Sequence, residues 1–519
     1  MIKVSRTERI VKNSFWGIVS RTVSLILSFV SRTVFINVLG KEFLGINGVY
    51  TEVLQVLSLA QLGFGTALNF ALYKPVADND REKTIKLLDF YKTVYRIIAV
   101  VVATLGLLLL PFLPKILNGA EHISAFNLRL YFLIFLANTV IGYFVSYKFS
   151  YINALQKNYI VTKIELVTNT VIVVLQILAI LVTKSFLVYL LIHTGLLALS
   201  RVAIFIYLGK KYPFLNQKVG DKLTKEEKKP IFREVKGLMV HQFSSVAVHS
   251  TDNIIISSLT GLGVVMVGLI SNYNMLINAV LGFVTLIFSS TTSSFGNLVA
   301  SSTSANYRKA FLDMNFLNFW VYGFCSIAFF ILIPPFIELW LGKDFLIDNV
   351  SFLLIVFNCF LVGQATIYNN ARVGKGDFNR DKWLSFSQAI VNLVVSIIAA
   401  KYLGLLGVYI GTIVSRLVVV VFRPILTYKF LFEKSSYEYY VTFVGYLVVI
   451  LISGAITYMA TYLLLREVTV LKFALSALIV AILPNLLFFV FTFWTNGFKS
   501  FFCRLKAFIP SRKVGVKND

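Results

Sequence analysis

Fourteen stretches of about 20 predominantly apolar residues follow one another along the 519-residue chain. A helix of that length and composition can cross the hydrocarbon core of a bilayer. Hydrophobic residues make up 57% of the sequence and charged residues only 14%, which a soluble protein of this size would not show. We therefore expect an all-α integral membrane protein with 14 transmembrane helices. The expected spans are at about residues 13–38, 44–72, 93–116, 128–152, 160–183, 186–209, 238–260, 264–292, 312–341, 350–371, 383–401, 405–428, 440–464 and 471–495.

The basic residues are distributed unevenly between the two sides of the membrane. If the N-terminus is placed in the cytoplasm, inner segments carry 35 of the 49 Lys and Arg residues and outer segments carry 8. Such an excess on the cytoplasmic side is what the positive-inside rule describes. We expect both termini in the cytoplasm and the chain in the cytoplasmic membrane, and the net charge of +25 gives no reason to expect a nucleic-acid partner.

One long polar segment, residues 210–236, divides the chain. We expect an N-lobe at 1–209, a basic cytoplasmic loop at 210–236, a C-lobe at 237–432, a final pair of spans at 433–495 and a basic tail at 496–519. A weak repeat supports the two lobes, because Gly45 and Tyr50 match Gly268 and Tyr273 at the same offset of 223 residues. Lobes with equal orientation on either side of a central site are one known plan of transporters.

The first expected span carries a polar stripe. Arg21, Ser24, Ser28 and Arg32 are spaced by three or four residues, so they share one helix face, with the arginines about 16 Å apart. An arginine at the centre of a bilayer costs about 2.5–3.5 kcal/mol on insertion scales, so it usually faces a cavity or a partner. The hypothesis is a substrate-binding pair, and the alternative is a structural ion pair or snorkelling to the membrane surface.

The seventh expected span carries a similar stripe of His241, Ser245, His249 and Asp252. Asp252 and Arg32 are expected at similar depth in the two lobes, so we interpret them as a gating pair that closes and parts. The histidines are candidates for proton coupling near neutral pH, or else ordinary buried, hydrogen-bonded side chains.

Amide and carboxylate side chains follow in the second and eighth expected spans. Their candidate role is to bind sugar hydroxyls, and the alternative is hydrogen bonding between helices. These residues are Asn47, Glu52, Gln55, Asn272 and Asn274, and Ser24 and Ser28 of the first expected span are candidates for the same role.

No motif for catalysis, a cofactor or a metal is visible. The sequence lacks a phosphate-binding loop of the G-x-x-x-x-G-K-[ST] type and a nucleophile elbow, and its three cysteines have no C-x-x-C spacing. The expected outer loops are about ten residues or fewer. We therefore expect a carrier rather than an enzyme, with no cofactor.

The stretches "VLGKEFLGINGVYTEVLQVLSLAQLGFGTALNFALYKPVADND" (38–80) and "STDNIIISSLTGLGVVMVGLISNYNML" (250–276) resemble the Wzx-type polysaccharide flippases of the multidrug/oligosaccharidyl-lipid/polysaccharide exporter superfamily. Within it, the chain is similar to the capsule and exopolysaccharide transporters of Gram-positive bacteria. The resemblance implies two six-helix lobes around a cationic cavity. The implied substrate is an undecaprenyl-diphosphate-linked oligosaccharide, moved from the inner to the outer leaflet by alternating access, with Arg21 and Arg32 on the diphosphate.

The resemblance also leaves alternatives. A flippase for lipid II or a teichoic-type precursor is the next candidate, followed by a cation-coupled drug exporter and a membrane polysaccharide polymerase. The expected partners are the lipid bilayer and the polymerase and glycosyltransferases of the same pathway, and the chain is expected to be a monomer. The sugars of the substrate are not readable from the sequence.

Overall fold

The structure is a computed structural model that describes residues 6–61, 63–217, 222–301, 304–375 and 381–508, and these ranges contain helices and no β-strand. The α-helices are α1 (Arg6–Leu57), α2 (Phe64–Ala77), α3 (Arg81–Leu109), α4 (Leu113–Ile116), α5 (Ala125–Ala154), α6 (Asn158–Thr183), α7 (Phe186–Lys211), α8 (Lys225–His249), α9 (Asp252–Leu259), α10 (Gly263–Ser301), α11 (Ser304–Leu341), α12 (Asn349–Lys375), α13 (Lys382–Leu403), α14 (Leu405–Thr427), α15 (Tyr437–Leu465), α16 (Val470–Thr492) and α17 (Asn496–Phe508). Short helical turns lie at Ser58–Gln61, Leu110–Phe112, Pro213–Asn216, Lys343–Phe345 and Tyr428–Phe432.

The expectation of an all-α, multi-pass membrane protein is confirmed, but the count of 14 spans is not. Twelve segments of the described chain are long and apolar enough to cross a membrane. The first and second expected spans run together in α1, where Gly40 bends the helix with φ 85°. The second span then breaks between Leu57 and α2, and the seventh breaks between α8 and α9. Broken helices are tolerated at membrane depth where the protein itself surrounds the freed backbone groups.

Helix α8 begins inside the segment expected to be a basic loop. The Thr224 hydroxyl accepts a hydrogen bond from the Glu227 N–H, and the Glu227 carboxylate accepts one from the Thr224 N–H. This capping box satisfies backbone donors that the first helical turn leaves unpaired. The hydrogen bond from the Thr224 N–H lowers the pKa of the Glu227 carboxyl, because it stabilises the charged form.

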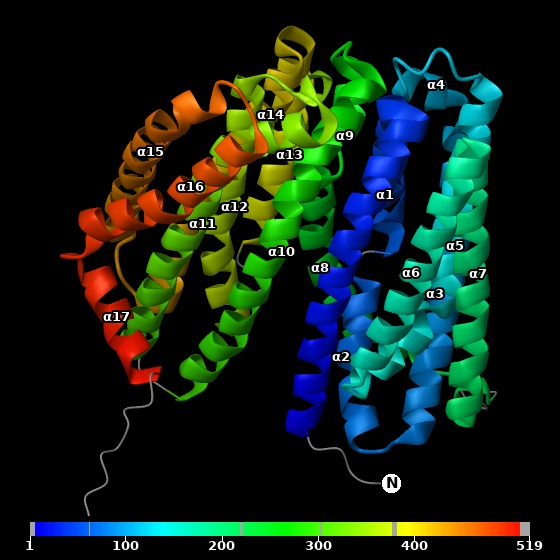
Figure 1. Cartoon of the computed structure of the whole chain (residues 1–519). Coiled ribbons are helices and arrows are strands. Elements are labelled where there is room, and N and C mark those ends of the chain that lie inside the picture. The colour runs from blue at the N-terminus through cyan, green and yellow to red at the C-terminus, as the bar shows by residue number, and fades with distance from the viewer. Residues whose placement is uncertain (1–5, 62, 218–221, 302–303, 376–380, 509–519) are drawn as a thin grey trace, which may run out of the picture. The chain divides into compact units, whose positions relative to one another are not determined.

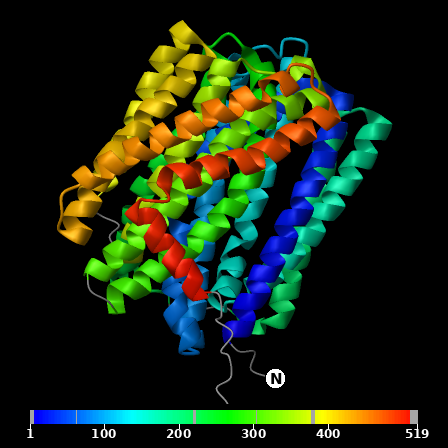
Figure 2. The same ribbon diagram turned by 60° about the vertical axis from the view of Figure 1, so that its left-hand side comes forward.

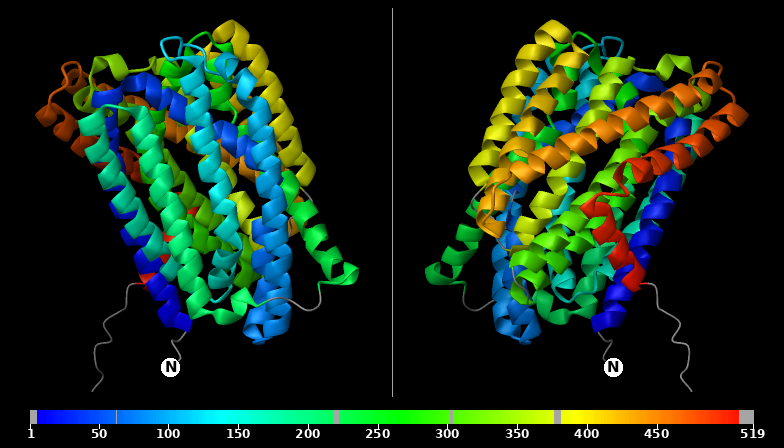
Figure 3. Two further views of the ribbon diagram at one scale, coloured as in Figure 1. Left: turned by 90° about the vertical axis from the view of Figure 1, so that its right-hand side faces the viewer. Right: turned by 90° about the vertical axis from the view of Figure 1, so that its left-hand side faces the viewer.

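The described helices pack into two units. Unit 1 contains the residues up to Ser271 and Ala389–Val408, and unit 2 contains Asn272–Gln388 and the residues from Tyr409 onward. In unit 1, α1 packs against α6, α3 against α5, and α7 against both α5 and α6, and Figures 1 and 3 show these long helices side by side. In unit 2, α11 packs against α12 and α16, and Figure 2 shows α15 and α16 as a helical hairpin that leads into α17. The lobe boundaries drawn from the sequence stay a prediction.

Two glycines allow α1 and α10 to cross in direct backbone contact. A Cβ atom on Gly45 would lie 1.7 Å from the Val264 carbonyl oxygen, and one on Gly268 would lie 2.2 Å from the Lys41 carbonyl oxygen. Lys41 and Val264 each precede their glycine by four residues, so the contact is reciprocal. Gly45 and Gly268 are also the positions that the sequence repeat makes equivalent. A reciprocal contact between equivalent residues is what a local two-fold axis produces.

Replacing Gly45 with alanine is expected to destabilise the protein. Because the new methyl group would meet backbone atoms that cannot rotate away, overpacking is expected to cost at least about 1–3 kcal/mol. The measurement is thermal unfolding of the purified protein, followed by tryptophan fluorescence. The control is Gly17→Ala in the same helix, where a Cβ has no atom within 4 Å, and which should leave the melting temperature unchanged or raise it. Equal melting temperatures for the two variants would contradict the crossing.

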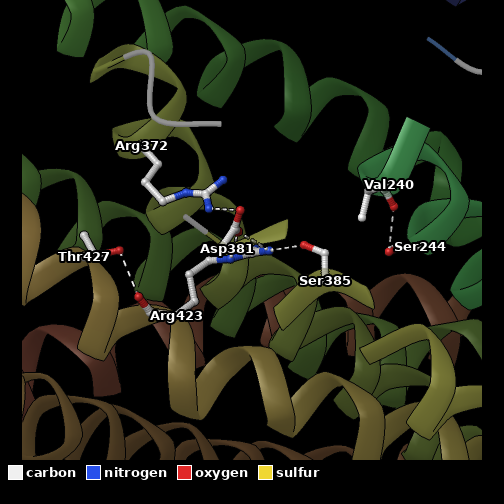
Figure 4. Close-up of polar contacts among 7 residues, drawn as sticks. All are labelled: Val240, Ser244, Arg372, Asp381, Ser385, Arg423 and Thr427. Atoms are coloured by element: carbon white, nitrogen blue, oxygen red, sulfur yellow. Dashed lines mark hydrogen bonds and ion pairs between the residues drawn. The ribbon is translucent and has the colours of Figure 1, made fainter. Parts of the chain in front are cut away.

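A buried ion cluster joins three helices of unit 2. Asp381, just before α13, has no exposed surface. Its carboxylate pairs with Arg372 of α12, and the guanidinium of Arg423 of α14 lies 3.0 Å from its other oxygen, as Figure 4 shows. Arg423 also donates a hydrogen bond of 3.4 Å to the Ser385 hydroxyl.

Replacing Asp381 with asparagine is expected to lower stability by about 3–5 kcal/mol, because it would leave two buried guanidinium groups without a counter-charge. The measurement is again the thermal unfolding midpoint. The matched control is Glu467→Gln, because Glu467 pairs with Lys472 at 3.2 Å but is 83% exposed. An exposed pair is worth at most about 1 kcal/mol. A similar small effect in both variants would show that the cluster does not stabilise the fold.

Candidate functional site

The polar stripe of α1 lies in unit 1, and its members differ in burial. Arg21, Ser24 and Arg32 are half-buried, whereas Ser28 is exposed. The guanidinium of Arg32 donates a hydrogen bond of 2.8 Å to the Ser271 hydroxyl of α10. Within the described residues Arg32 forms no ion pair, so the alternative of a structural ion pair finds no partner there.

Ser271 links Arg32 to the glycine crossing. Its hydroxyl donates to the Gly268 carbonyl oxygen at 2.8 Å and accepts the hydrogen bond from Arg32. Tyr189 of α7 also lies close enough to Arg32 for an electrostatic interaction. The position of the Arg32 charge is therefore fixed by neutral groups, and the guanidinium keeps most of its five N–H donors for another ligand.

Side chains in the second half of α1 form hydrogen bonds with the chain at the break between α8 and α9. The Glu52 carboxylate accepts hydrogen bonds from the Asn253 backbone N–H at 2.9 Å and from its side-chain amide at 2.6 Å. The Ser250 hydroxyl donates to the Gln55 side-chain oxygen at 2.6 Å. A carboxylate at a helix N-terminus satisfies unpaired N–H groups and complements the helix dipole. Glu52 thus supports the broken helix, a role that the sequence did not reveal.

The gating candidates are placed only in part. Asp252 is half-buried and lies close enough to Glu52 for electrostatic repulsion. His241 is half-buried on α8, and the side chain of His249 is outside the described part of the structure. The opening and closing of an Arg32–Asp252 pair stays a prediction.

A cavity of about 480 Å³ lies beside this polar region, between α1, α5, α7 and α8. We call it the polar cavity. It brings together Asn47 and Gln55, two of the predicted residues, whereas Arg21, Arg32 and Glu52 are not among its lining residues. The lining is polar and carries no carboxylate, lysine or arginine: Asn47, Thr51, Gln55, Ser58, Gln61, Asn138, Thr139, Tyr189 and His193, with Leu54, Phe135, Leu190 and Val246.

Several lining residues of the polar cavity were missed from the sequence. Asn138 and Thr139 lie on α5, and Tyr189 and His193 lie on α7. Each is an isolated polar residue in an apolar run, which is more often a hydrogen-bonded core residue than part of a site. These residues come to line the same cavity only because α5 and α7 pack beside α1.

Asn272 and Asn274 belong to unit 2. Asn272 is buried and Asn274 half-buried on α10. Their assignment to the same cavity as the α1 side chains stays a prediction.

Comparisons with known proteins agree with this architecture. A family model described as "Polysaccharide biosynthesis protein" matches residues 10–292. No curated protein matches the chain. Among solved structures, the lipid II flippase MurJ in an inward closed conformation is similar over 95% of this chain and 99% of its own, with a TM-score of 0.61 and 14% identity.

Two further structures of the MOP superfamily are similar in fold. An inward-facing multidrug resistance MATE family transporter covers 81% of this chain and 98% of its own, with a TM-score of 0.59 and 16% identity. A transporter from Pyrococcus furiosus Vc1 (DSM3638), whose binding pocket has reverse polarity, covers 82% and 97%, with a TM-score of 0.53 and 16% identity. At these identities the likeness shows the fold alone.

Removing the Glu52 carboxylate is expected to loosen α9. In Glu52→Ala the Asn253 N–H loses its partner, and the loss of a cap of this kind costs about 0.5–2 kcal/mol. The measurement is amide hydrogen exchange across residues 252–259, which should accelerate. The neighbouring Thr51→Ala is the control, because the Thr51 hydroxyl bonds within its own helix to the Asn47 carbonyl oxygen. Unchanged exchange in Glu52→Ala would rule out the capping role.

Proposed function

We propose that this chain, which belongs to the polysaccharide biosynthesis protein family, is a flippase for undecaprenyl-diphosphate-linked oligosaccharide repeat units. It moves them from the inner to the outer leaflet of the cytoplasmic membrane by alternating access, for capsular or exopolysaccharide synthesis. It is a carrier and catalyses no covalent step. Both termini are cytoplasmic, as the distribution of basic residues predicts.

The observation that carries the proposal is the environment of Arg32. A half-buried guanidinium in an apolar helix is costly, and its hydrogen-bond partner is a neutral hydroxyl rather than a carboxylate. A diphosphate is a suitable counter-charge, because forked guanidinium donors match phosphate oxygens. Arg21, about 16 Å nearer the cytoplasmic end of the same helix, would receive the head group first.

The lining of the polar cavity is chemically suited to the glycan part of the proposed substrate. Amide and hydroxyl side chains donate and accept hydrogen bonds without adding charge, as sugar hydroxyls require. Asn47, Gln55, Asn138 and Thr139 supply such groups from α1 and α5. A neutral lining gives a cationic drug little electrostatic attraction, which disfavours drug export as the alternative.

An apolar groove of unit 2 is chemically suited to the prenyl tail of the proposed substrate. A cavity of about 240 Å³ in unit 2 lies between α11, α12 and α15 and is lined almost entirely by apolar side chains, including Phe330, Phe357, Phe360 and Leu451. Burial of a hydrocarbon chain there requires no polar partner. A groove of this kind could hold a prenyl chain, whichever leaflet its head group occupies.

Part of the driving force for transport would come from the membrane potential acting on the negative charge of the diphosphate. Moving a negative charge outward is favoured by an inside-negative potential, by about 2.3 kcal/mol per charge per 100 mV. Two charges on a diphosphate would gain roughly 4.6 kcal/mol per 100 mV.

The test is a flipping assay in liposomes with defined undecaprenyl-diphosphate glycans. Arg32→Ala and Arg21→Ala are each expected to lower the rate at least about tenfold, because a charge-assisted hydrogen bond is worth about 1.5–3 kcal/mol. Arg32→Lys, which keeps the charge but loses the fork, should be intermediate. The control is Lys343→Ala, because Lys343 is 82% exposed. Wild-type rates in both arginine variants would refute the proposal.

Two further arms separate the alternatives. Faster transport of lipid II than of the glycan-linked lipid would favour the precursor flippase. In a deletion strain, a flippase predicts lipid-linked repeat units trapped on the cytoplasmic leaflet, whereas loss of a polymerase would leave them on the outer leaflet.

A further inference from the structure

A second cavity of unit 1, between α3, α5 and α7, has a different chemistry from the polar cavity. Its volume is about 480 Å³, and we call it the basic cavity. Its charged lining residues are all cations: Lys92, Arg96 and Arg201. The rest of the lining consists of Ile141, Tyr143, Phe144, Val145, Tyr147, Ala198, Val202 and Phe205.

The positive charge of the basic cavity is only partly balanced. Arg201 pairs with Glu165 at 3.7 Å. Neither Lys92 nor Arg96 forms an ion pair within the described part of the chain. Lys148, whose side chain has no exposed surface, lies close enough to Lys92 for mutual repulsion, and its ammonium group donates a hydrogen bond of 3.2 Å to the Phe205 carbonyl oxygen and lies over the Phe205 ring. The Asp89 carboxylate of α3 also acts on Tyr147, but it forms no ion pair with Lys92 or Arg96 among the described residues, so these two cations would be stabilised by an anion in the cavity.

The rim of the basic cavity is apolar and outward-facing. Phe144, Val202 and Phe205 line it, and they are 52%, 56% and 41% exposed. On a protein that spans a membrane, exposed apolar side chains of this kind contact lipid chains. Lys92 and Arg96 lie at the inner end of the third expected span, 93–116, whereas Arg201 lies eight residues, about 12 Å, inside the sixth, 186–209. Lys92 and Arg96 are therefore expected close to the depth of lipid phosphates.

We propose that the basic cavity binds the phosphate of an anionic membrane phospholipid, whose acyl chain lies along Phe144, Val202 and Phe205. Lys92 and Arg96 pair with the phosphate, and the Tyr147 hydroxyl is placed to donate a further hydrogen bond. Its lining shares no residue with the α1 stripe or with the polar cavity, and the proposal does not depend on which substrate is transported. The positive-inside rule places it on the cytoplasmic side, where anionic lipids attract basic groups.

Native mass spectrometry of the delipidated full-length protein tests the proposal. Phosphatidylglycerol and phosphatidylcholine with identical acyl chains are added in parallel. Wild type is expected to retain the anionic lipid about tenfold more than the zwitterionic one. In the double variant Lys92→Gln/Arg96→Gln the preference should fall to near equality. These two residues are chosen because removing Arg201 would also disturb its ion pair with Glu165.

The matched control is Lys225→Gln/Lys229→Gln, which removes two exposed cations of α8, a helix that contributes no residue to the cavity lining, and should keep the tenfold preference. A preference that survives in the cavity variant, or that falls equally in the control, would overturn the site. A third arm adds a polyprenyl diphosphate. If that lipid is retained through Lys92 and Arg96 while phosphatidylglycerol is not, the cavity is a substrate site and the phospholipid assignment is wrong.

Discussion

The cost of an unpaired backbone group in lipid is the constraint on which the rest of the structure depends. It makes every described element helical, and it determines where a helix can stop inside the membrane. Ser250, at the break between α8 and α9, is buried, and its hydroxyl donates a hydrogen bond to Gln55, two residues before α1 ends at Leu57. Glu52 then supplies an acceptor for the first N–H groups of α9. The polar residues of α1 thus stabilise the interruptions that open a cavity beside them.

Charge is distributed in unit 1 according to the same cost. Arg32 is held by a hydroxyl, the polar cavity carries amides and hydroxyls, and the basic cavity gathers cations behind an apolar rim. Unit 2 shows the opposite solution, because Arg372, Asp381 and Arg423 neutralise one another in a buried cluster. Arg372 and Arg423 have their counter-charge within the fold, whereas the described contacts of Arg32 are to neutral groups.

The sequence predicted the membrane class and the helical fold, because apolar length is a local signal. It did not predict the split of two spans, since a broken helix keeps the composition of a continuous one. Nor did it reveal the pairing of Asp381 with two arginines, because residues 372 and 423 are far apart in sequence and both resemble loop charges. His193 and Asn138 were missed for a related reason: a single polar residue carries no sign of the neighbours that turn it into part of a cavity.

The glycine crossing has a mechanical consequence. Where α1 meets α10, backbone touches backbone, with no side chain between Gly45 and Val264 that could change rotamer and absorb a shift. A helix crossing in direct backbone contact permits rotation of the helices about the point of contact and resists sliding of one helix along the other. Any motion in unit 1 that changes access to the polar cavity would then bend the chain at the interruptions after Leu57 and His249, and leave the pivot itself unchanged.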